Sequence, residues 1–349
     1  MKILFSSYTF SPHVGGIESI SAILAEKFAD AGHDVDLITE TEAENARRST
    51  FNVQRSTPDR DYRITRHPSF GKLMRLLTWC DLLFQNNISL RSLIPALLLR
   101  KRVIVVHQTW LRNVTGEIGW NNRLKLALLH RVTNVAISQA ILDHIKVSAR
   151  IIGNPYDDSV FRLLPDVVRD KTLVFLGRLV SDKGADLLLR AMKLLHQDDL
   201  RPNLTIVGSG PEERNLQHLS RDLGLDRQVT FAGTRTGEEL AKLLNQHRIL
   251  VVPSKWPEPF GIVALEGIAC GCVVVGSADG GLKEAIGPCG VTFENGNENA
   301  LANCLAKLLL DPDAGANFQK AAPEHLAKFR ANAVASAYLE LIQKCDRRA

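Results

Sequence analysis

Apolar runs typical of buried strands alternate with helical patterns along the whole chain. Met1–Phe5 is the first apolar run, and from Gly16 to Ala31 the apolar residues recur at the helical period. Strands that are covered on both faces belong to parallel sheets, and parallel neighbours need a crossover connection, usually a helix. The alternation therefore restricts the chain to the α/β class. In the first half the predicted strands are residues 1–5, 34–38, 82–84, 103–106, 134–137 and 150–152.

The same alternation restarts after Asn154-Pro155, where the proline ends any helix. The strands predicted beyond it are residues 172–176, 204–207, 229–231, 249–252 and 273–275, with helices at 185–197, 212–223, 237–246 and 261–270. A chain of 349 residues is long for one core and suits two α/β domains of about 150 to 180 residues each. We expect two Rossmann-like, doubly wound parallel-sheet domains, residues 1–155 and 156–330, facing a cleft at the carboxyl ends of their strands.

Composition narrows the cellular setting. No apolar run approaches the roughly 18 residues that a membrane span needs, and Met1–Phe5 lacks the pattern of a signal peptide. We therefore expect a cytoplasmic protein. The 6 cysteines show neither C-x-x-C spacing nor a paired framework, which predicts reduced thiols and no zinc site.

The net charge of +5 is unevenly distributed. Between Arg47 and Arg75 there are eight basic residues against two aspartates. Such a cluster fits anionic lipid head groups or an acidic glycan, and it fits a solvated loop equally well. If it meets lipid, the protein is peripheral on the inner face of the membrane. No aromatic-interleaved basic stripe accompanies the charge, which argues against nucleic acid as a partner. The basic residues are Arg47, Arg48, Arg55, Arg60, Arg63, Arg66, Lys72 and Arg75.

The segment Pro253–Glu266 carries the strongest functional signal. It joins the predicted strand 249–252 to a proline-rich loop and then to a helix that opens at Gly261. The first free amides of that helix point out of the carboxyl edge of the sheet, where the helix dipole favours an anion such as a diphosphate. Glu266 lies one turn beyond Ile262 on the same helix face, so its carboxylate is placed to accept hydrogen bonds from ribose hydroxyls. The pattern predicts a nucleotide-sugar site.

Two cations follow another strand of the second half. Arg178 comes directly after the strand 172–176 and Gly177, and Lys183 lies five residues further, just before a predicted helix. A strand, a tight basic loop and a helix form an anion-binding arrangement, and two cations roughly match the charge that a nucleoside diphosphate develops as it leaves. With both cations in that role, no divalent metal is needed.

These motifs resemble those of the GT4 family of retaining glycosyltransferases, which have the GT-B architecture. The matching elements are the E-x7-E pair Glu258 and Glu266, the G-R-x4-K-G run that begins at Gly177, and the G-G-x-E loop at Gly15. The resemblance implies metal-independent hexosyl transfer, with retention, from a UDP- or GDP-linked sugar to a hydroxyl acceptor. The acceptor would be a glycan or a lipid-linked group in bacterial polysaccharide, lipopolysaccharide or glycolipid assembly. It also implies that a closing helix at about 331–349 packs back on the first domain.

Residue roles are carried over from the same resemblance. Glu258 and His107 would orient the donor sugar, Glu266 would hold the ribose, and Arg178 with Lys183 would stabilise the leaving diphosphate. A single histidine such as His107 is more often structural, although it ends the strand 103–106 at the expected ligand edge. The further donor-binding positions would be Gly15, Gly16, Gly208, Gly210, Gly233, Thr234, Phe260, Gly261 and Ile262.

Of three alternatives, two stay open at this point. A dinucleotide-dependent oxidoreductase would need G-x-G-x-x-G after the first strand, which the sequence from Gly15 to Glu18 does not supply. A non-catalytic nucleotide-sugar or glycan-binding relative and an enzyme with a soluble small-molecule acceptor remain. The resemblance is weakest between Thr39 and Arg102, where acceptor recognition would lie. The leucines at positions 73, 76, 77 and 83 there fit either a core-facing helix or a membrane-surface helix.

Overall fold

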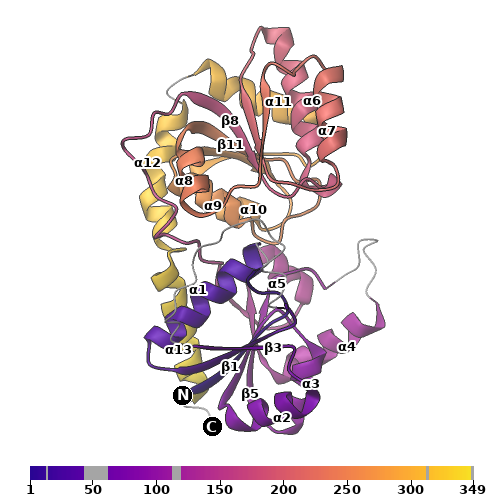
Figure 1. The fold of residues 1–349 in the computed structure, drawn as a ribbon, viewed down its shortest axis with the longest axis vertical. Helices are drawn as coiled ribbons and strands as arrows, with labels where there is room; N and C mark the ends of the chain where they lie inside the picture. The colour runs from indigo at the N-terminus through magenta and orange to yellow at the C-terminus, as the bar shows by residue number, and fades with distance from the viewer. Residues whose placement is uncertain (13–14, 43–61, 112–118, 312–313, 347–349) are drawn as a thin grey trace. The chain divides into compact units, whose positions relative to one another are not determined.

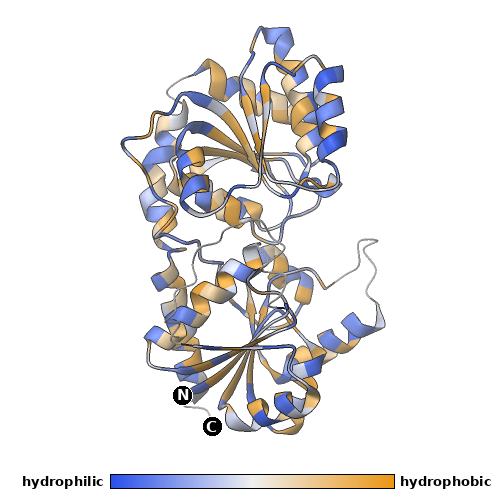
Figure 2. Cartoon of the chain, in the orientation of Figure 1, coloured by the Kyte–Doolittle hydropathy of each residue, from blue (hydrophilic) through white to orange (hydrophobic). Residues whose placement is uncertain are grey.

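The computed structural model describes residues 1–12, 15–42, 62–111, 119–311 and 314–346. The chain divides into two compact units (Figure 1). Unit 1 consists of Met1–Pro155 and Ala331–Ala349, and unit 2 of Tyr156–Arg330. Each unit contains one parallel sheet with flanking helices, and the strands form its most hydrophobic part (Figure 2). The predicted α/β class with doubly wound parallel sheets is therefore confirmed.

Within the described residues, the sheet of unit 1 has seven strands in the order β3-β2-β1-β4-β5-β6-β7. The chain runs outward from β1 in one direction and returns to β4 on its other side. Strand order thus reverses between β1 and β4, which marks the usual ligand position at the carboxyl ends of such strands. The strands are β1 (Lys2–Ser7), β2 (Asp34–Thr39), β3 (Arg63–Arg66), β4 (Leu82–Asn86), β5 (Arg102–His107), β6 (Thr133–Ala136) and β7 (Arg150–Ile151).

The helices of unit 1 cover this sheet, and buried side chains of helices and strands pack together as the core of the unit. Phe5 of β1, Phe28 and Phe84 form an aromatic cluster with ring centroids 4.8 to 6.2 Å apart, and Tyr338 joins it at 5.4 Å from Phe84. Tyr338 lies on the last helix of the chain, so that helix packs on the first sheet. The helices are α1 (Gly16–Asp30), α2 (Phe70–Trp79), α3 (Leu90–Leu98), α4 (Trp120–Leu128), α5 (Gln139–Ile145) and α13 (Ala331–Asp346).

In unit 2 the described sheet has six strands in the order β10-β9-β8-β11-β12-β13, with the reversal between β8 and β11. The strands are β8 (Lys171–Leu176), β9 (Leu204–Val207), β10 (Val229–Gly233), β11 (His247–Val252), β12 (Val273–Ser277) and β13 (Gly290–Phe293). Their buried aliphatic residues pack against the helices α6 (Ala185–Leu195), α7 (Glu213–Asp222), α8 (Gly237–Asn245), α9 (Ile262–Ala269), α10 (Leu282–Ile286), α11 (Glu298–Leu310) and α12 (Ala314–Ala327).

The predicted strands all form, and two further strands were not predicted. β3 has the sequence Arg-Ile-Thr-Arg, which offers no apolar run, and β13 begins at Gly290 with only four residues. Both are edge strands, where one side stays open and the apolar signal is weak. They take their conformation from the neighbour with which they pair, β2 and β12 respectively.

The region from Thr39 to Arg102 resolves one of the open alternatives. Leu73, Leu76 and Leu77 are buried on α2, and Leu83 is buried on β4. The core-facing interpretation is correct, and the membrane-surface interpretation is wrong for these leucines. No helix in the described part of the chain is both long and apolar enough to cross a membrane.

Part of the basic cluster has intramolecular partners. Arg63 pairs with Asp34 at 2.8 Å and with Asp36 at 3.4 Å, and Arg66 donates a hydrogen bond to the Thr41 carbonyl. These two cations help to attach β3 to the sheet, while Lys72 and Arg75 are exposed on α2. The remaining members lie outside the described residues, namely Arg47, Arg48, Arg55 and Arg60.

Candidate active site

Three loops meet at the carboxyl edge of the sheet in unit 2. They follow β8, β9 and β11, the strands at and beside the reversal of strand order. The loop after β8 is bonded to both others: the Leu179 amide donates to the Ser209 carbonyl at 2.9 Å, and the Lys255 amide donates to the Asp182 carbonyl at 2.8 Å. The segments that the sequence singled out separately therefore form one continuous surface.

Glycines allow these loops to approach each other. Gly208 has φ 136°, and a Cβ there would lie closer than 3.0 Å to the Gly177 carbonyl oxygen. A Cβ at Gly210 would meet the Leu179 carbonyl, and one at Gly184 would meet the Pro253 carbonyl, again closer than 3.0 Å. Only glycine avoids these backbone clashes. Gly208 and Gly210 thus have a structural reason to be glycine, whatever they contact in a complex.

The loop after β11 leads into α9 at Gly261. Gly261 has φ 103° and caps the helix, and Ile262 is its first residue. Phe260, just before the cap, is only 2% exposed, and its ring lies 5.6 Å from the ring of Phe329. The side chain of Phe260 therefore anchors the loop in the core of unit 2. This anchor holds the amino end of α9 at the carboxyl edge, where its free amides form an anion-binding position.

An ion pair that the sequence did not predict joins two of the candidate catalytic residues. Lys183 Nζ lies 2.5 Å from Glu258 Oε1, and Ser254 Oγ donates to the same oxygen at 2.6 Å. The two charged side chains are 25% and 14% exposed. The Glu258 backbone is also fixed, because its carbonyl accepts the Gly281 amide at 2.7 Å. Glu258 is therefore held in place by three neighbours.

Arg178 differs from Lys183 in having no side-chain partner among the described residues. It lies in the same loop, is exposed, and makes no ion pair or side-chain hydrogen bond with the described residues. An unpaired guanidinium beside the amino end of a helix is available to an anionic ligand.

Glu266 lies on α9, one turn after Ile262. Burial raises the pKa of its carboxyl to about 7, and the nearby charge of Asp157 adds to the shift. Within the described residues its side chain makes no hydrogen bond. A half-buried carboxylate with no protein donor gains most from a ligand that donates hydrogen bonds to it.

Gly233 and Thr234 end β10 beside the loop after β9. Gly233 has φ 66°, and its carbonyl accepts the Gly208 amide at 2.9 Å. Thr234 Oγ1 donates to Ser209 Oγ at 3.0 Å. These two residues lie at one end of the surface that the loops form. Their contact with the base of a nucleotide stays a prediction.

The remaining predicted site residues belong to unit 1. His107 ends β5 and is fully buried; its Nε2 lies 3.0 Å from Asn134 Oδ1, and its Nδ1 has no hydrogen-bond partner in the part of the chain that the structure describes. Burial lowers the pKa of His107, so the ring is neutral at pH 7. Gly15 caps α1 and Gly16 begins it, both at the carboxyl end of β1. Residues 13 and 14 of that loop lie outside the described residues. A contact of these three residues with a donor stays a prediction.

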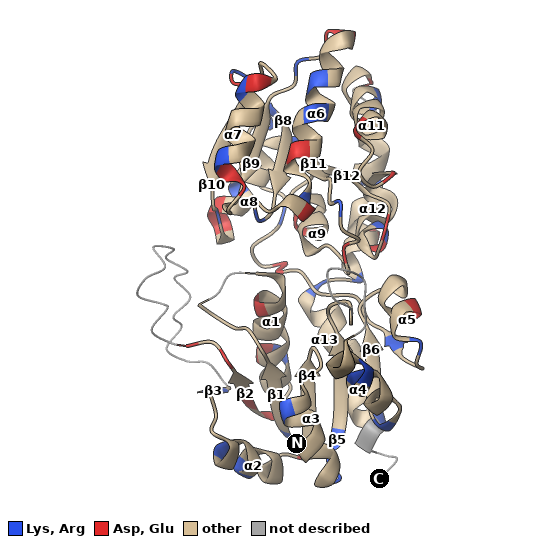
Figure 3. Ribbon diagram, turned by 90° about the vertical axis from the view of Figure 1, so that its right-hand side faces the viewer, with Lys and Arg blue, Asp and Glu red and all other residues tan. Residues whose placement is uncertain are grey.

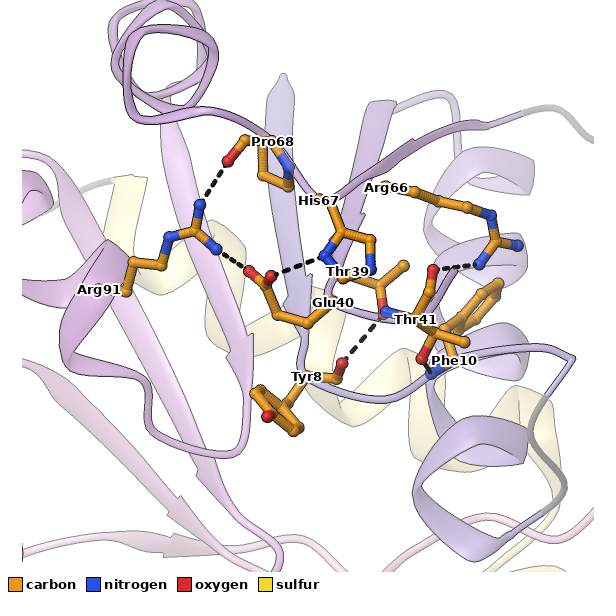
Figure 4. Close-up of polar contacts among 9 residues, drawn as sticks. All are labelled: Tyr8, Phe10, Thr39, Glu40, Thr41, Arg66, His67, Pro68 and Arg91. Atoms are coloured by element: carbon orange, nitrogen blue, oxygen red, sulfur yellow. Dashed lines mark hydrogen bonds and ion pairs between the residues drawn. The ribbon is translucent and has the colours of Figure 1, made fainter. Parts of the chain in front are cut away.

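Sequence reasoning missed a polar cluster at the carboxyl edge of unit 1, shown in Figure 4. Glu40 follows β2 and accepts hydrogen bonds from Arg91 of α3, while His67 Nδ1 lies 3.3 Å from its other oxygen. Arg91 also donates to the Pro68 carbonyl. Tyr8, which follows β1, is 71% exposed beside them. The members are far apart in the sequence and share no motif, so no sequence pattern signals the cluster.

No three or more described His, Cys, Asp or Glu side chains are grouped so as to hold a metal ion. The thiols of Cys80, Cys270, Cys272, Cys289 and Cys304 are free. Burial raises the pKa of Cys80 and Cys289 to about 11, so these thiols stay protonated and unreactive at pH 7.

The family model described as glycosyl transferases group 1 matches residues 163–325, all within unit 2. Curated relatives include the D-inositol 3-phosphate glycosyltransferases of Corynebacterium jeikeium, 37% identical over 185 residues, and of Stackebrandtia nassauensis, 36% identical over 187. These matches cover 50% and 49% of this chain, and 44% and 42% of the relatives. The chain thus spans less than half the length of the curated relatives that it matches.

Similar solved structures cover the whole chain. Sucrose-phosphate synthase from Thermosynechococcus elongatus has a TM-score of 0.82 at 22% identity, with 100% of each chain covered. The Anabaena protein Alr3699/HepE, in complex with UDP and glucose, has a TM-score of 0.79 at 21% identity, covering 99% of this chain and 100% of its own. At such identities the likeness establishes the fold. The chain therefore has the GT-B glycosyltransferase fold, and its residues 163–325 match the glycosyl transferases group 1.

Proposed function

We propose that this protein is a retaining, metal-independent glycosyltransferase of the GT4 type, which moves a hexosyl group from a nucleotide-sugar donor to a hydroxyl acceptor. The observation that carries the proposal is one edge of unit 2, where Lys183, Glu258 and the amino end of α9 meet at the reversal of strand order. That edge combines an anion position, two cations and a fixed carboxylate, as sugar transfer from a diphosphate requires.

The donor is assigned from the chemistry of that edge. The α9 amides and Arg178 bind the diphosphate, and Glu266 accepts hydrogen bonds from the ribose. Lys183 exchanges its contact with Glu258 for a phosphate oxygen, which leaves Glu258 free to accept hydrogen bonds from the sugar hydroxyls. The complex of the Anabaena protein with UDP and glucose supports a UDP-linked sugar, with a GDP-linked sugar as the alternative.

The proposed reaction needs few protein groups to stabilise the leaving phosphate and to accept the proton of the acceptor. As the bond from the sugar to the diphosphate breaks, negative charge grows on the departing phosphate, next to Arg178 and Lys183. The acceptor hydroxyl attacks on the same face, and the departing phosphate takes its proton. The configuration is then retained, and no separate protein base is required.

The acceptor is assigned to unit 1. Glu40 is fixed by Arg91 and His67 at the carboxyl ends of the first strands, with the exposed ring of Tyr8 beside it. A fixed carboxylate next to an aromatic ring suits a polyhydroxylated ring. Since the curated relatives are named for D-inositol 3-phosphate, a small soluble polyol is our first candidate. A glycan or lipid-linked acceptor in polysaccharide, lipopolysaccharide or glycolipid assembly is the second.

The setting of the enzyme follows from the acceptor. With a soluble polyol the protein is cytoplasmic, and with a lipid-linked acceptor it is also peripheral on the inner face of the membrane. The segment Arg47 to Arg75 would then supply the contact with anionic lipid. Exposed Lys72 and Arg75 are its described members without an ion pair.

Thermal-shift measurements with UDP, GDP, ADP and their glucose conjugates test the donor, because a ligand that binds only the folded state raises Tm. We expect UDP and UDP-glucose to give the largest shifts, with or without EDTA. Product formation is then followed with myo-inositol, D-inositol 3-phosphate and a short lipid-linked glycan as acceptors. Nucleotide binding without turnover on any acceptor would favour the non-catalytic binding protein, and no nucleotide binding at all would refute the proposal.

A further inference from the structure

A cavity of about 530 Å³ lies at the amino ends of β4, β5 and β6 in unit 1, the edge opposite to Glu40 and Tyr8. Residues from the starts of these strands line it, together with Leu341 and Lys344 of α13. Its volume is within the range of small-molecule sites, which is roughly 300 to 1,000 Å³. No part of the proposed sugar transfer uses this edge.

The lining is strongly basic. Lys101, Arg102, Arg131 and Lys344 are basic, His130 lies beside them, and none of the described residues that line the cavity is Asp or Glu. Figure 3 shows the basic residues at the start of β5. The whole chain has 43 basic and 38 acidic residues, so this described lining is more basic than the average surface. The like charges of Arg131 and Lys344 at one cavity favour a bound anion.

Two described carboxylates near the lining residues in the sequence are bonded elsewhere. Asp81 precedes β4 and accepts the Lys2 amide at 2.8 Å, and Glu340 of α13 pairs with Arg150 at 3.5 Å. Neither lines the cavity. Arg131 and Lys344 are exposed and make no ion pair with the described residues. Their charges are therefore not neutralised within the part of the protein that the structure describes.

One wall of the cavity is rigid and another is apolar. Lys101 Nζ donates to the Thr78 carbonyl at 3.1 Å and to the Cys80 carbonyl at 2.8 Å, which fixes this ammonium at the edge. Val132 and Leu341 line the cavity and are partly exposed, so they supply aliphatic surface beside this ammonium. An anion bound here would contact charged groups on one side and aliphatic groups on the other.

We propose that this amino-edge cavity is a second ligand site that binds a phosphate-bearing molecule. A phosphate monoester carries about −1.5 to −2 charges at pH 7, so the charges of Arg131 and Lys344 match one phosphate group. Arg131 and Lys344 bind the phosphate oxygens, and the aliphatic wall packs against the rest of the molecule. The phosphate belongs either to a lipid head group or to a soluble metabolite, and the test below separates these sources.

The test uses the full-length protein and the double substitution Arg131→Gln with Lys344→Gln. Isothermal titration is done with inorganic pyrophosphate as the soluble probe, and with dihexanoyl phosphatidate below its micelle concentration as the lipid probe. The matched control is Arg123→Gln with Lys146→Gln, which removes the same charge from exposed positions of unit 1 outside the cavity. Melting curves check that all proteins are folded.

We expect the cavity variant to lose affinity for at least one probe by about tenfold or more, since two charge-assisted contacts disappear. The control should change by less than about twofold. Loss confined to phosphatidate assigns a lipid head group, and loss that includes pyrophosphate assigns a soluble phosphate. Equal losses in the two variants, or no loss with either probe, would overturn the site. UDP binding should be unchanged in both variants, so a failure of this site is distinguishable from a failure of the proposed sugar transfer.

Discussion

Neutralising Glu258 should tighten nucleotide binding while it slows sugar transfer. The substitution Glu258→Gln keeps the size of the side chain and removes the charge that holds Lys183 at 2.5 Å. At that distance and an effective dielectric constant of about 20, the Coulomb attraction is about 7 kcal/mol. Most of it is offset by the cost of removing both charges from water, which leaves about 1 to 2 kcal/mol for a pair that is only 25% and 14% exposed.

This net attraction between Lys183 and Glu258 opposes the binding of UDP, because Lys183 must leave Glu258 to reach a phosphate oxygen. Without the charge, UDP should bind about tenfold more tightly, which corresponds to about 1.4 kcal/mol. The value of kcat should fall about 100-fold, since the sugar loses its fixed carboxylate. Isothermal titration with UDP and initial rates with the UDP-sugar measure the two effects.

A matched control separates the effect of the Glu258 charge from the effect of its hydrogen bond with Ser254. Ser254→Ala removes the 2.6 Å hydrogen bond to Glu258 and leaves the ion pair with Lys183 in place. UDP affinity should then stay within about twofold of the original value. If Glu258→Gln weakens UDP binding, or if Ser254→Ala strengthens it equally, the argument that Lys183 is released from Glu258 is wrong.

Three further predictions concern the same edge of unit 2. The pKa of Glu266 is raised to about 7 from 4.5, so the folded state binds a proton more tightly than the unfolded state. As the pH rises from about 4.5 to 7, the free energy of unfolding should therefore fall by up to about 3 kcal/mol. Glu266→Gln should remove this dependence in urea titrations across that range, and a pH profile identical to wild type would exclude the shift. Gly208→Ala places a Cβ against the Gly177 carbonyl and should lower the free energy of unfolding by about 2 to 4 kcal/mol, whereas Gly224→Ala, which also has positive φ but open space around it, should cost about 1 kcal/mol. Arg178→Ala should lower kcat about 100-fold or more without changing Tm, and wild-type activity should survive EDTA; a requirement for a divalent ion would contradict the metal-free assignment.

Much of the fold was predictable because it rests on local pattern. Continuous apolar runs identified the strands that lie inside the two described sheets, since such strands are covered on both faces, and the edge strands β7 and β10 were predicted as well. The strands that were missed, β3 and β13, are edge strands whose few residues carry little apolar signal. Sequence periodicity reports burial, and it fails where burial is incomplete.

The candidate site was predictable only in its parts. The order of strands and motifs placed Arg178, Lys183 and the start of α9 at the carboxyl ends of strands, which in a doubly wound sheet meet at one edge. No sequence pattern indicates that Lys183 bonds to Glu258, because 75 positions separate the two residues and side-chain geometry decides the contact. Phe260 likewise matched a donor-binding motif, while its ring packs in the core.

The sequence alone determined the α/β class, the parallel sheets and the position of the edge that we propose binds phosphate. Apolar periodicity identifies the strands, and the helix starts follow these strands directly in the chain. Tertiary structure alone decided which charges neutralise one another. Glu40 lies between Arg91 and His67, and Glu258 lies against Lys183, while Arg131 and Lys344 have no such partner in the described chain. Each of these outcomes depends on distances of a few ångströms between side chains from different elements, and Coulomb energies at that range change with position far more than with residue type.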